Sequence, residues 1–558
     1  MRHHPIPARL SILALVLSVF SLPVGAQVTP ERLLNPDKEP HNWLTYSGSY
    51  LSQRYSQLKK IDTSNAKQLE LKWVFQAQSL QSFEASPLVV DGVMYLTQAP
   101  NDVVALDAKT GRVFWIYPYK PLATARPCCG QVNRGLAMLG HTLFMATIDS
   151  QLIAIDSRDG NPLWKTTVGE ATAGYAMTVA PLIVKDKVVT GVAGGEYGIR
   201  GFIAAYDAKT GKEAWRFYTI PGPGEPGNET WRREDWQTGG APIWTTGSYD
   251  PALNLTYWGA GNAGPDWNPS QRPGDNLYTN SVVALDADTG QIKWHFQFSP
   301  HDAYDYDATQ VPVLVDTTWK GFPRKLMMWA NRNGFFYVLD RATGEFLAGY
   351  PFVKINWASG LDAKGRPIQT PQPAGTATFP GSFGGTNWYS PSYSPRTGLF
   401  YVSAWENYGL VFKPVEQKYK AGQSFSGGGV ASAAPNVPMP PFLKGGPINN
   451  FVGVGGSGAV IAIDPATGQK KWKYEMVDVT TSGILTTASD LLFTGGREGD
   501  FKALDAITGA LLWKASLGGQ IVNGPITYEV DGVQYVATTA GNSLFTFALR
   551  RPDSETGR

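Results

Sequence analysis

Apolar and polar residues alternate along this chain in one unit that recurs from end to end. Each copy has an alternating run, then Asp-x-x-Thr-Gly (Asp-x-x-Asp-Gly in the second copy), then a second alternating run. Alternation with period two is typical of strands, and glycine supplies the positive φ that a tight hairpin turn needs. Each copy therefore predicts two antiparallel strands. Seven copies are visible, with their aspartates at Asp107, Asp156, Asp207, Asp286, Asp340, Asp464 and Asp505.

The spacing of these aspartates indicates propeller blades. Four of the six steps are 41 to 54 residues long, which suits four-stranded blades. The longest step spans 124 residues, but residues 394–403 resemble the strands at residues 248–259 that open the fourth unit. We therefore expect residues 394–403 to open a sixth unit, which a Gly- and Pro-rich insertion at about 413–457 enlarges.

The two ends of the chain predict how the ring closes. Residues 524–549 supply three strands and no fourth, while residues 71–76 resemble a tryptophan-bearing outer strand with no unit before it. Pairing these ends gives an all-β, eight-bladed β-propeller in which no sheet edge is exposed. A tryptophan stands eight residues after the aspartate in six of the seven copies, and we expect it to fill the seam between blades.

The N-terminus predicts export. Arg2 and Arg9 precede an apolar run at residues 10–20, and small residues at 24–26 fit a cleavage site. We expect a signal peptide at 1–26, one propeller domain at 27–552, a tail at 553–558 and a periplasmic location. No later stretch approaches twenty apolar residues, so no membrane span is expected.

Charge and composition limit the classes of molecule that this protein could bind. The formal net charge is +2, and no run rich in lysine or arginine occurs, so nucleic acid is excluded as a partner. Many glycines and prolines with few charged residues favour short strands and turns over helices. The expected ligands are small solutes.

The only cysteines, Cys128 and Cys129, are adjacent. A disulfide between neighbours restricts the unfolded chain very little, so a purely stabilising crosslink is disfavoured. An oxidised pair would form a flat, rigid plate able to pack on a planar ring, and an exported compartment permits it. The alternative is two buried thiols that act as small apolar residues.

Five motifs occur in an order that resembles the pyrroloquinoline quinone (PQQ) dependent methanol and ethanol dehydrogenases. The resemblance spans about residues 30–550 of the chain. The motifs are Cys-Cys-x-x-x-x-Arg at 128–134, GEYGIRG at 195–201, WGAGN at 258–262, HDAYDYD at 301–307 and NRNG at 331–334.

The resemblance implies how the cofactor would be bound. PQQ is a flat ortho-quinone with carboxylate groups; the family stacks it between a cysteine pair, here Cys128 and Cys129, and an indole, here Trp244. Arg134 would pair with a carboxylate of the cofactor, since a planar guanidinium suits bidentate contact. The full implied cofactor-binding set is Glu84, Cys128, Cys129, Arg134, Thr178, Ala193, Gly194, Gly195, Trp244, Arg332 and Asn387.

The resemblance also implies a cation site and a catalytic base. Glu196, Asn262 and Asp305 would supply oxygen ligands for a cation that coordinates the quinone. Asp305 would take the alcohol proton, while the cation and Arg332 polarise the C5 carbonyl that receives the substrate's hydride or oxygen. Asp307 resembles the lanthanide-dependent branch, and its added charge favours a trivalent ion such as La³⁺ or Ce³⁺. Calcium, with Asp307 outside the ligand set, is the alternative.

Departures from the family pattern bear on the substrate. Pro242 stands where many relatives have threonine, Ala193 stands where some have serine, and Thr481 replaces a tryptophan that contacts the cofactor. The segment at 537–549 is shorter than the loop that narrows the pocket in methanol-specific relatives. We therefore expect an alcohol larger than methanol, with a sugar or polymer alcohol as the alternative. His301 matches no family role, and we expect it to be structural.

Electron transfer requires an external partner on this interpretation. The chain has no Cys-x-x-Cys-His motif for attaching haem c, so a separate cytochrome c is the expected acceptor. Assembly as a homodimer is an open alternative to a monomer. The competing interpretation from another class is a non-enzymatic propeller scaffold of the cell envelope, which would need neither the cysteine pair nor the three cation ligands.

Overall fold

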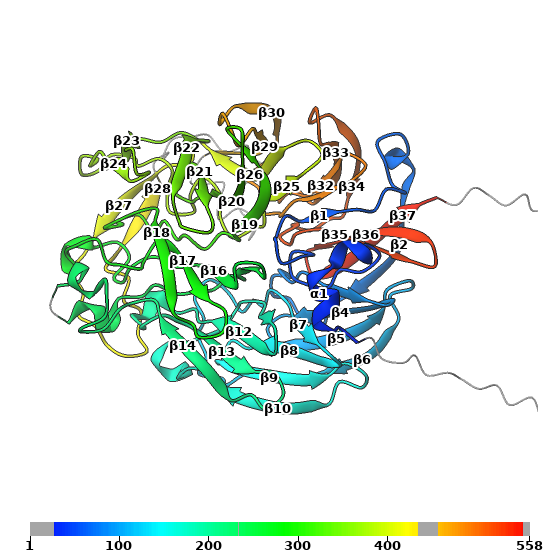
Figure 1. Ribbon diagram of the computed structural model, residues 1–558, viewed down its shortest axis with the longest axis horizontal. Helices are drawn as coiled ribbons and strands as arrows, with labels where there is room; N and C mark the ends of the chain where they lie inside the picture. The colour runs from blue at the N-terminus through cyan, green and yellow to red at the C-terminus, as the bar shows by residue number, and fades with distance from the viewer. Residues whose placement is uncertain (1–26, 233, 433–455, 551–558) are drawn as a thin grey trace, which may run out of the picture.

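Eight sheets form a ring (Figure 1). Seven have four antiparallel strands, and one has four antiparallel strands and a short fifth strand that pairs in parallel. This computed structural model describes residues 27–232, 234–432 and 456–550. The predicted all-β class and the eight-bladed propeller are confirmed. No helix in these ranges is long and apolar enough to cross a membrane. The helical segments are α1 (Pro30–Leu34) and the 3-10 turns η1 (Pro36–Lys38), η2 (Ala66–Gln68), η3 (Ala171–Ala173), η4 (Gly195–Tyr197), η5 (Asn228–Thr230), η6 (Asp235–Thr238) and η7 (Pro269–Gln271).

Blades one to four follow one another along the chain, and each contains one copy of the repeat. Their strands are β3 (Leu88–Val90), β4 (Val93–Gln98), β5 (Asp102–Asp107) and β6 (Val113–Tyr117); β7 (Ala137–Leu139), β8 (Thr142–Ala146), β9 (Gln151–Asp156) and β10 (Pro162–Thr167); β11 (Leu182–Val184), β12 (Lys187–Gly191), β13 (Phe202–Asp207) and β14 (Glu213–Tyr218); and β15 (Ser248–Asp250), β16 (Leu255–Gly259), β17 (Ser281–Asp286) and β18 (Ile292–Gln297).

Blades five to seven contain the remaining copies, and blade eight has none. Their strands are β19 (Val313–Trp319), β20 (Phe322–Ala330), β21 (Phe335–Asp340) and β22 (Phe346–Pro351); β25 (Ser392–Ser394), β26 (Leu399–Glu406), β29 (Ser457–Ile463) and β30 (Lys470–Glu475); β31 (Leu485–Thr487), β32 (Leu491–Thr494), β33 (Asp500–Asp505) and β34 (Leu511–Ser516); and β35 (Ile526–Val530), β36 (Val533–Ala540), β37 (Ser543–Leu549) and β2 (Leu69–Gln76).

The ring closes as the sequence predicts. The N-terminal strand β2 pairs antiparallel with β37, from Leu69 opposite Leu549 to Gln76 opposite Ser543. This pairing completes blade eight and leaves neither end of the chain as an open sheet edge. Figure 1 shows the blue N-terminal and red C-terminal segments side by side at this point.

A central segment (residues 50–56) crosses the middle of the ring, which the repeat pattern does not predict. Its carbonyls accept hydrogen bonds from the first strands of four blades, and its last residues, β1 (Tyr55–Ser56), pair in parallel with β31. Arg54 is buried, and its guanidinium donates to the carbonyls of Ile484 and Pro525 at 3.2 and 2.7 Å. The donors to the segment are the amides of Tyr249, Leu314, Tyr393 and Thr486.

The repeat tryptophans lie at the seams, as expected. Trp115 on the outer strand of blade one packs against the turn of Gly160 in blade two, where a Cβ would stand 2.6 Å from the ring. Its Nε1 donates to the carbonyl of Ser157, 3.2 Å away. Tyr350 takes this place in blade five, whose copy lacks the tryptophan. The same contact joins Trp73 to Gly111, Trp164 to Gly211, Trp215 to Gly290, Trp294 to Gly344 and Trp472 to Gly509.

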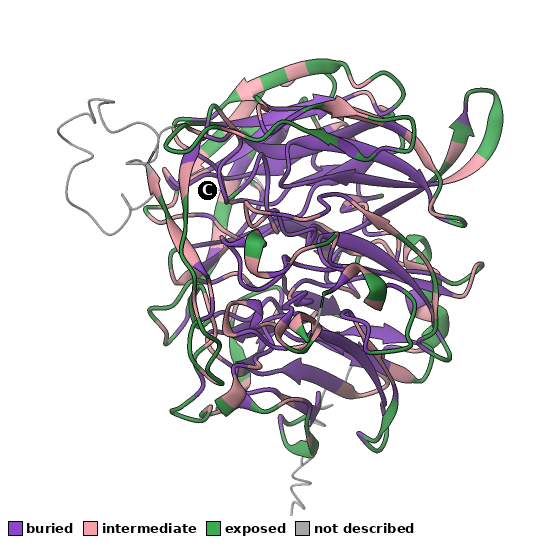
Figure 2. Ribbon diagram, turned by 90° about the vertical axis from the view of Figure 1, so that its left-hand side faces the viewer, coloured by how far each residue is buried: buried purple, intermediate pink, exposed green. Residues whose placement is uncertain are grey.

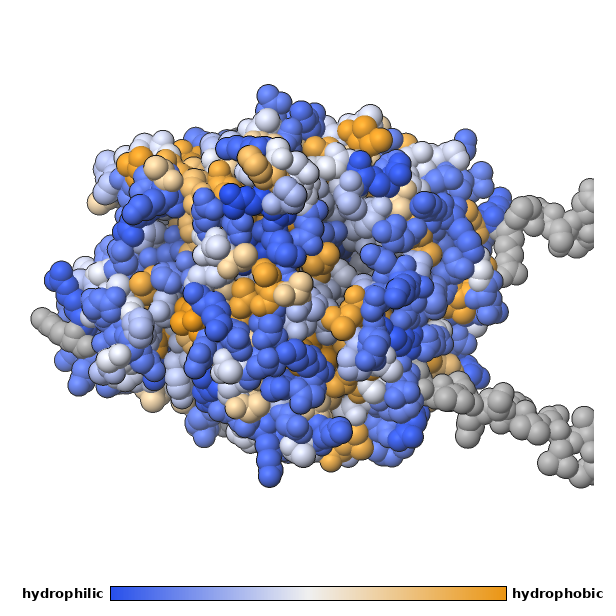
Figure 3. Space-filling model, in the orientation of Figure 1, coloured by the Kyte–Doolittle hydropathy of each residue, from blue (hydrophilic) through white to orange (hydrophobic). Residues whose placement is uncertain are grey.

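Burial follows the order of strands within a blade. The inner strands are buried on both faces because each blade packs between two others, whereas outer strands such as β34 alternate between exposed and half-buried residues (Figure 2). Apolar residues on the face shown in Figure 3 form separate patches among hydrophilic residues, which is ordinary for a protein surface.

Strand direction decides which connections can build a site. Because neighbouring strands alternate in direction, the loop from a blade's second to third strand and the loop to the next blade reach the same face of the ring. We call this the upper face. The Asp-x-x-Thr-Gly turns join third to fourth strands and therefore lie on the opposite face.

Two extra hairpins extend the upper-face connections. The hairpin of β23 (Ala358–Leu361) and β24 (Pro367–Gln369) lies between blades five and six, and that of β27 (Leu410–Pro414) and β28 (Gly428–Ser432) follows β26 in blade six. The second hairpin belongs to the predicted insertion, which interrupts the blade from residue 407 to 456. Residues 433–455, the predicted signal peptide at 1–26 and the tail at 553–558 lie outside the described residues.

The seam contacts give a first prediction. Replacing Trp115 with alanine removes a half-buried indole and its hydrogen bond, so we expect the free energy of unfolding to fall by about 2 to 3 kcal/mol. Trp115→Phe keeps the ring contact and should cost about 1 kcal/mol. Urea unfolding measures both. Leu163→Ala, at a side chain 53% exposed, is the control and should change little; equal losses in all three variants would contradict the seam role.

Candidate active site

Every residue implied by the resemblance lies in an upper-face connection. Glu84 lies between blades eight and one, and Asn387 between blades five and six. Loops from second to third strands hold three further groups, in blades three, four and five: residues 193–196, Asn262 and Arg332. The remaining connections between blades hold Cys128, Cys129, Arg134, Thr178, Trp244, Asp305 and Asp307.

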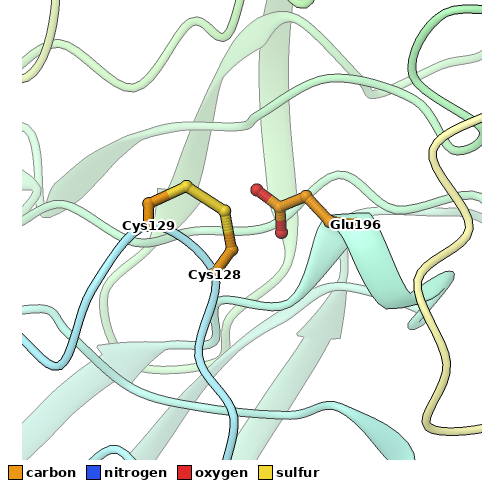
Figure 4. A group of neighbouring side chains, drawn as sticks. All are labelled: Cys128, Cys129 and Glu196. Atoms are coloured by element: carbon orange, nitrogen blue, oxygen red, sulfur yellow. A yellow bond between two sulfur atoms is a disulfide. The ribbon is translucent and has the colours of Figure 1, made fainter. Parts of the chain in front are cut away.

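Cys128 and Cys129 form a disulfide with their Cα atoms 3.8 Å apart. Glu196, on the 3-10 turn η4, directs its carboxylate toward the two sulfurs (Figure 4), and these ligand atoms lie within 4.8 Å of one another. The turn begins after Gly194, which has φ +119°. A Cβ there would stand 2.1 Å from the carbonyl oxygen of Gly174, so only glycine allows this approach.

Arg134 is buried among polar and aromatic partners. It forms an ion pair with Glu84 at 2.8 Å and donates to the Thr178 hydroxyl at 2.9 Å. Its guanidinium carbon lies 4.9 Å from the ring centre of Trp244 and 4.5 Å from that of Trp388. Burial raises the pKa of Glu84, and Arg134 opposes the shift. These contacts fix the guanidinium in one orientation.

Asp307 connects two parts of the site. Its Oδ2 accepts from Nε1 of Trp244 at 3.0 Å, and its Oδ1 accepts from the backbone amide of Asn262 at 2.6 Å. Gly261 makes this approach possible, because a Cβ there would stand 2.5 Å from Oδ1. The indole, the carboxylate and the loop that holds Asn262 are therefore one hydrogen-bonded unit.

Arg332 binds the two carboxylates of the 305–307 loop. Its Nη1 lies 3.2 Å from Oδ1 of Asp305 and 3.4 Å from Oδ2 of Asp307, and it donates to the carbonyl of Asp305 at 2.6 Å. Its Nη2 donates to Oδ1 of Asn387 at 3.3 Å. Asp305 has φ +60°, a left-handed conformation that a non-glycine residue adopts at a cost. The contacts to Arg332 hold it there.

Buried carboxylates outnumber cations in this region. Burial raises the pKa of Glu196 to about 7, with Asp307 adding to the shift. Burial also raises the pKa of Asp305 well above its usual range, against the opposing charge of Arg332. Among the described residues, Arg332 forms the ion pairs to Asp305 and Asp307, and no ion pair reaches Glu196. The surplus of negative charge is a favourable environment for a cation.

The structure gathers the predicted residues into two groups. One contains Glu196 with Cys128 and Cys129. The other joins Trp244, Asn262, Asp305, Asp307, Arg332 and Asn387 through the contacts above, and Arg134 adds Glu84 and Thr178 to it through its contact with Trp244. Among the described side chains, Glu196, Asp305 and Asp307 do not form a carboxylate cluster within 4.8 Å. His301 contacts the carbonyl of Gly274 at 2.8 Å, in keeping with a structural role.

One missed element is a strap (residues 415–428) within the blade-six insertion. The amide of Phe425 donates to the carbonyl of Glu196 at 2.6 Å, and Tyr419 and Phe425 both pack against Gly198 at the end of η4. Side-chain and backbone hydrogen bonds join Gln417 to Gln271 of blade four. The strap therefore ties blade six to the loops that hold Glu196 and Asn262. No repeat signal predicts its path.

A second missed residue is Trp388, which stacks on Arg134. It directly follows Asn387 in the chain, so adjacency to an implied contact was the one signal that could have found it. Thr481, at the position of a tryptophan in relatives, has a buried hydroxyl without a hydrogen-bond partner among the described residues.

Comparison with known proteins identifies the family. The family model for glucose, ethanol and alcohol dehydrogenase β-propeller domains matches residues 43–356. A quinoprotein alcohol dehydrogenase, PedH of Pseudomonas putida, is 38% identical over 95% of this chain and 91% of its own. A lanthanide-dependent methanol dehydrogenase of Methylacidiphilum fumariolicum is 37% identical over 92% and 86%. The chain belongs to the PQQ-dependent alcohol dehydrogenases.

Solved structures agree with this family. A europium-containing methanol dehydrogenase superposes with a TM-score of 0.85 at 35% identity, covering 93% of this chain and all of that one. The quinohemoprotein alcohol dehydrogenase ADHIIG of Pseudomonas putida gives 0.87 at 36% identity, over 95% and 85%. A second family model, for the outer membrane protein assembly factor BamB, matches residues 456–558. The site residues from Glu84 to Arg332 lie in the dehydrogenase match, so the scaffold interpretation is set aside.

The residues present fit the family's quinone cofactor. Nε of Arg134 and Nε of Arg332 are buried and have no hydrogen-bond partner in the described part of the chain. Unsatisfied cationic donors are costly inside a protein, and an anionic ligand such as PQQ would satisfy them. The carboxylate of Glu196, which forms no ion pair with any described residue, fits a metal ion in the same way.

Glu196 gives a prediction for the metal-free protein. The pKa of a glutamate side chain in an unfolded protein is about 4.3. Because the folded pKa is raised to about 7, wild type should lose stability as pH rises from about 4.3 through 7, where the buried carboxylate must ionise. Glu196→Gln lacks this group and should be more stable than wild type at pH 8 but not at pH 4.

Thermal unfolding in a metal chelator at both pH values measures the difference. Glu416→Gln, at an exposed position on the strap, is the matched control and should follow wild type at both pH values. If Glu196→Gln lost as much stability with rising pH as wild type, the buried carboxylate would not be the cause.

Proposed function

We propose that this protein is a periplasmic, lanthanide-dependent quinoprotein that oxidises alcohols larger than methanol and passes the electrons to a separate cytochrome c. Alcohol oxidation with PQQ and a metal follows from the family. The observation that carries the finer proposal is the pair of carboxylates at Asp305 and Asp307, which both contact Nη1 of Arg332.

On this proposal Asp305 is the catalytic base and Arg332 orients it. When bound, PQQ accepts the two electrons of the alcohol, and the metal polarises the carbonyl that receives them. Asp305 takes the proton of the substrate hydroxyl on its carboxylate, and burial raises the pKa of this carboxyl, which makes it a stronger base. Arg332 opposes this rise in the pKa and orients the carboxylate through its contact at 3.2 Å.

Other residues orient the cofactor. Arg134 and Arg332 present buried N–H groups to its anionic edges. The disulfide of Cys128 and Cys129 and the indole of Trp244 supply the flat surfaces for its two faces. Glu84, Thr178 and Asn387 hold the guanidinium groups that contact it.

Charge supports a lanthanide over calcium. Glu196, Asn262, Asp305 and Asp307 would supply oxygen ligands, and three of these four are carboxylates. Each added carboxylate attracts a trivalent ion more strongly than a divalent one at equal distance. The 37% identity to a lanthanide-dependent methanol dehydrogenase supports the same choice. Calcium binding with Asp307 outside the ligand set is the competing case.

Reconstitution with PQQ and La³⁺, Ce³⁺ or Ca²⁺ tests the metal. We expect dye-linked ethanol oxidation to be higher with the lanthanides. Asp307→Ala should lose lanthanide-dependent activity by about 10²-fold or more, since it removes a charged ligand, and should lose less with Ca²⁺. Asp288→Ala, an exposed aspartate on a repeat turn of the opposite face, is the control. Full activity with Ca²⁺ and no gain from lanthanides would refute the assignment.

The rim of the site supports a larger substrate. In blade eight only residues 541 and 542 connect β36 to β37, so this blade adds no long loop above the site. Thr481 leaves more room than the tryptophan of relatives. Export by the predicted signal peptide is part of this proposal. The two cysteines are bonded to each other and hold no haem, which supports an external cytochrome acceptor.

A substrate panel tests the size of the pocket. We expect kcat/KM for 1-butanol and cyclohexanol to exceed that for methanol by about tenfold or more, because burying added methylene groups contributes about 0.8 kcal/mol each. Thr481→Trp should lower turnover of the larger alcohols, while Thr481→Ser should not. Preference for methanol would contradict the proposal, and preference for glucose or polyvinyl alcohol would favour the sugar or polymer alternative.

A further inference from the structure

Asp266 is a buried carboxylate that neither the repeat nor the family motifs explain. It lies four residues after Asn262, in the connection from β16 to β17, and is 4% exposed. Its Oδ1 is buried without a hydrogen-bond partner, and no cation forms an ion pair with its carboxylate among the residues the structure describes. An unpaired buried carboxylate is costly, so this arrangement indicates a missing positive partner.

Arg272, the arginine beside Asp266, donates to backbone carbonyls and not to the Asp266 carboxylate. Arg272 is buried and donates from Nε to the carbonyl of Pro265 at 3.1 Å, and from Nη1 to Oδ1 of Asn276 at 3.1 Å. Its Nη2 donates to the carbonyl of Asp266 itself at 3.3 Å. Arg272 therefore fixes the course of this loop and leaves the Asp266 carboxylate available.

The carboxylate of Asp266 faces Asn262. The two side chains lie close enough to interact, and the amide nitrogen is the only group of Asn262 that can donate to an ionised carboxylate. The same nitrogen lies 3.4 Å from the carbonyl of Ala263. The other end of the amide, Oδ1, lies 3.7 Å from the position of a Cβ on Gly195, beside Glu196. Asn262 thus has its oxygen beside Gly195, which precedes the proposed ligand Glu196 in the chain, and its nitrogen available to Asp266.

The strap contacts the loop around Asp266. Trp267 donates through its backbone amide to the carbonyl of Ser426 in the strap, at 2.9 Å. Gly427 of the strap packs against Pro265, where a Cβ would stand 2.7 Å from the proline ring. Arg272 and the strap together hold the backbone of the loop that carries the carboxylate.

We propose that Asp266 is a further residue of the cation site, which accepts from the amide nitrogen of Asn262, turns the asparagine oxygen toward the ion and adds a buried negative charge. The inference rests on the proposed function. Asp266 is a positioning residue, since it acts through Asn262. With Glu196, Asp305 and Asp307 it makes four carboxylates around the site, against the two guanidinium groups of Arg332 and Arg272. Such an excess favours a trivalent ion over a divalent one.

The test measures metal binding by the full chain loaded with PQQ. Affinity for Tb³⁺ is followed by its luminescence, and La³⁺ and Ca²⁺ are measured by competition. We expect Asp266→Asn to weaken Tb³⁺ and La³⁺ binding by about tenfold or more, in the range found for residues that orient metal ligands, and Ca²⁺ binding by less. Asp266→Glu keeps the charge and should bind lanthanides within a few-fold of wild type.

Asp275→Asn is the matched control. It removes the same charge from the same inter-strand connection, but Asp275 is ion-paired with Arg366 at 2.8 Å. Its metal affinities should equal those of wild type. Wild-type lanthanide affinity in Asp266→Asn would overturn the inference while leaving the proposed function intact. Failure of wild type to bind any of the three ions would instead overturn the proposed function.

A measurement on wild type covers the case in which Asp266→Asn does not fold. In a crystal structure with Tb³⁺ and PQQ, the inference expects Oδ1 of Asn262 on the ion at about 2.5 Å and the amide nitrogen on Asp266. An ion without Asn262 among its ligands, or an Asp266 carboxylate bonded elsewhere, would overturn it.

Discussion

The fold depends on the pairing of β2 with β37. Each blade buries both faces of its inner strands against its neighbours, so a blade at an open end of the row would leave one face exposed to water. Joining the first strand to the last removes that end, and Trp73 on β2 then packs on the turn of Gly111 in blade one. The central segment adds a second closure, since its carbonyls accept hydrogen bonds from four blades at once. A rigid ring follows from these two contacts.

A rigid ring allows loops from distant parts of the chain to form one site. The connections on the upper face come from every blade and converge there because strand direction alternates. Contacts between these loops then set the geometry of the site. Arg332 donates to the carbonyl of Asp305, and Trp244 donates to the carboxylate of Asp307. The strap extends this principle across the face, because Phe425 of blade six holds the turn that presents Glu196.

The buried carboxylates of the site lower the stability of the metal-free fold. Burial raises the pKa values of Glu196, Asp305 and Asp266, so each carboxylate is held against the preference of its surroundings. One guanidinium, that of Arg332, pairs with only part of this charge. The buried negative charge lowers the stability of the metal-free protein and, for the same reason, attracts a cation. Stability and metal binding therefore depend on the same buried carboxylates.

The sequence by itself determined the blades, their number and their closure, because strand alternation and the Asp-x-x-Thr-Gly turn are local signals that repeat. It also determined the family, since five motifs such as His301 to Asp307 keep their order. Only the tertiary structure decided that Glu196 faces the disulfide, that Phe425 reaches the same turn and that Asp266 meets Asn262. These contacts join irregular loops without a period, and the distance between two such loops is set by how eight blades pack around a common centre.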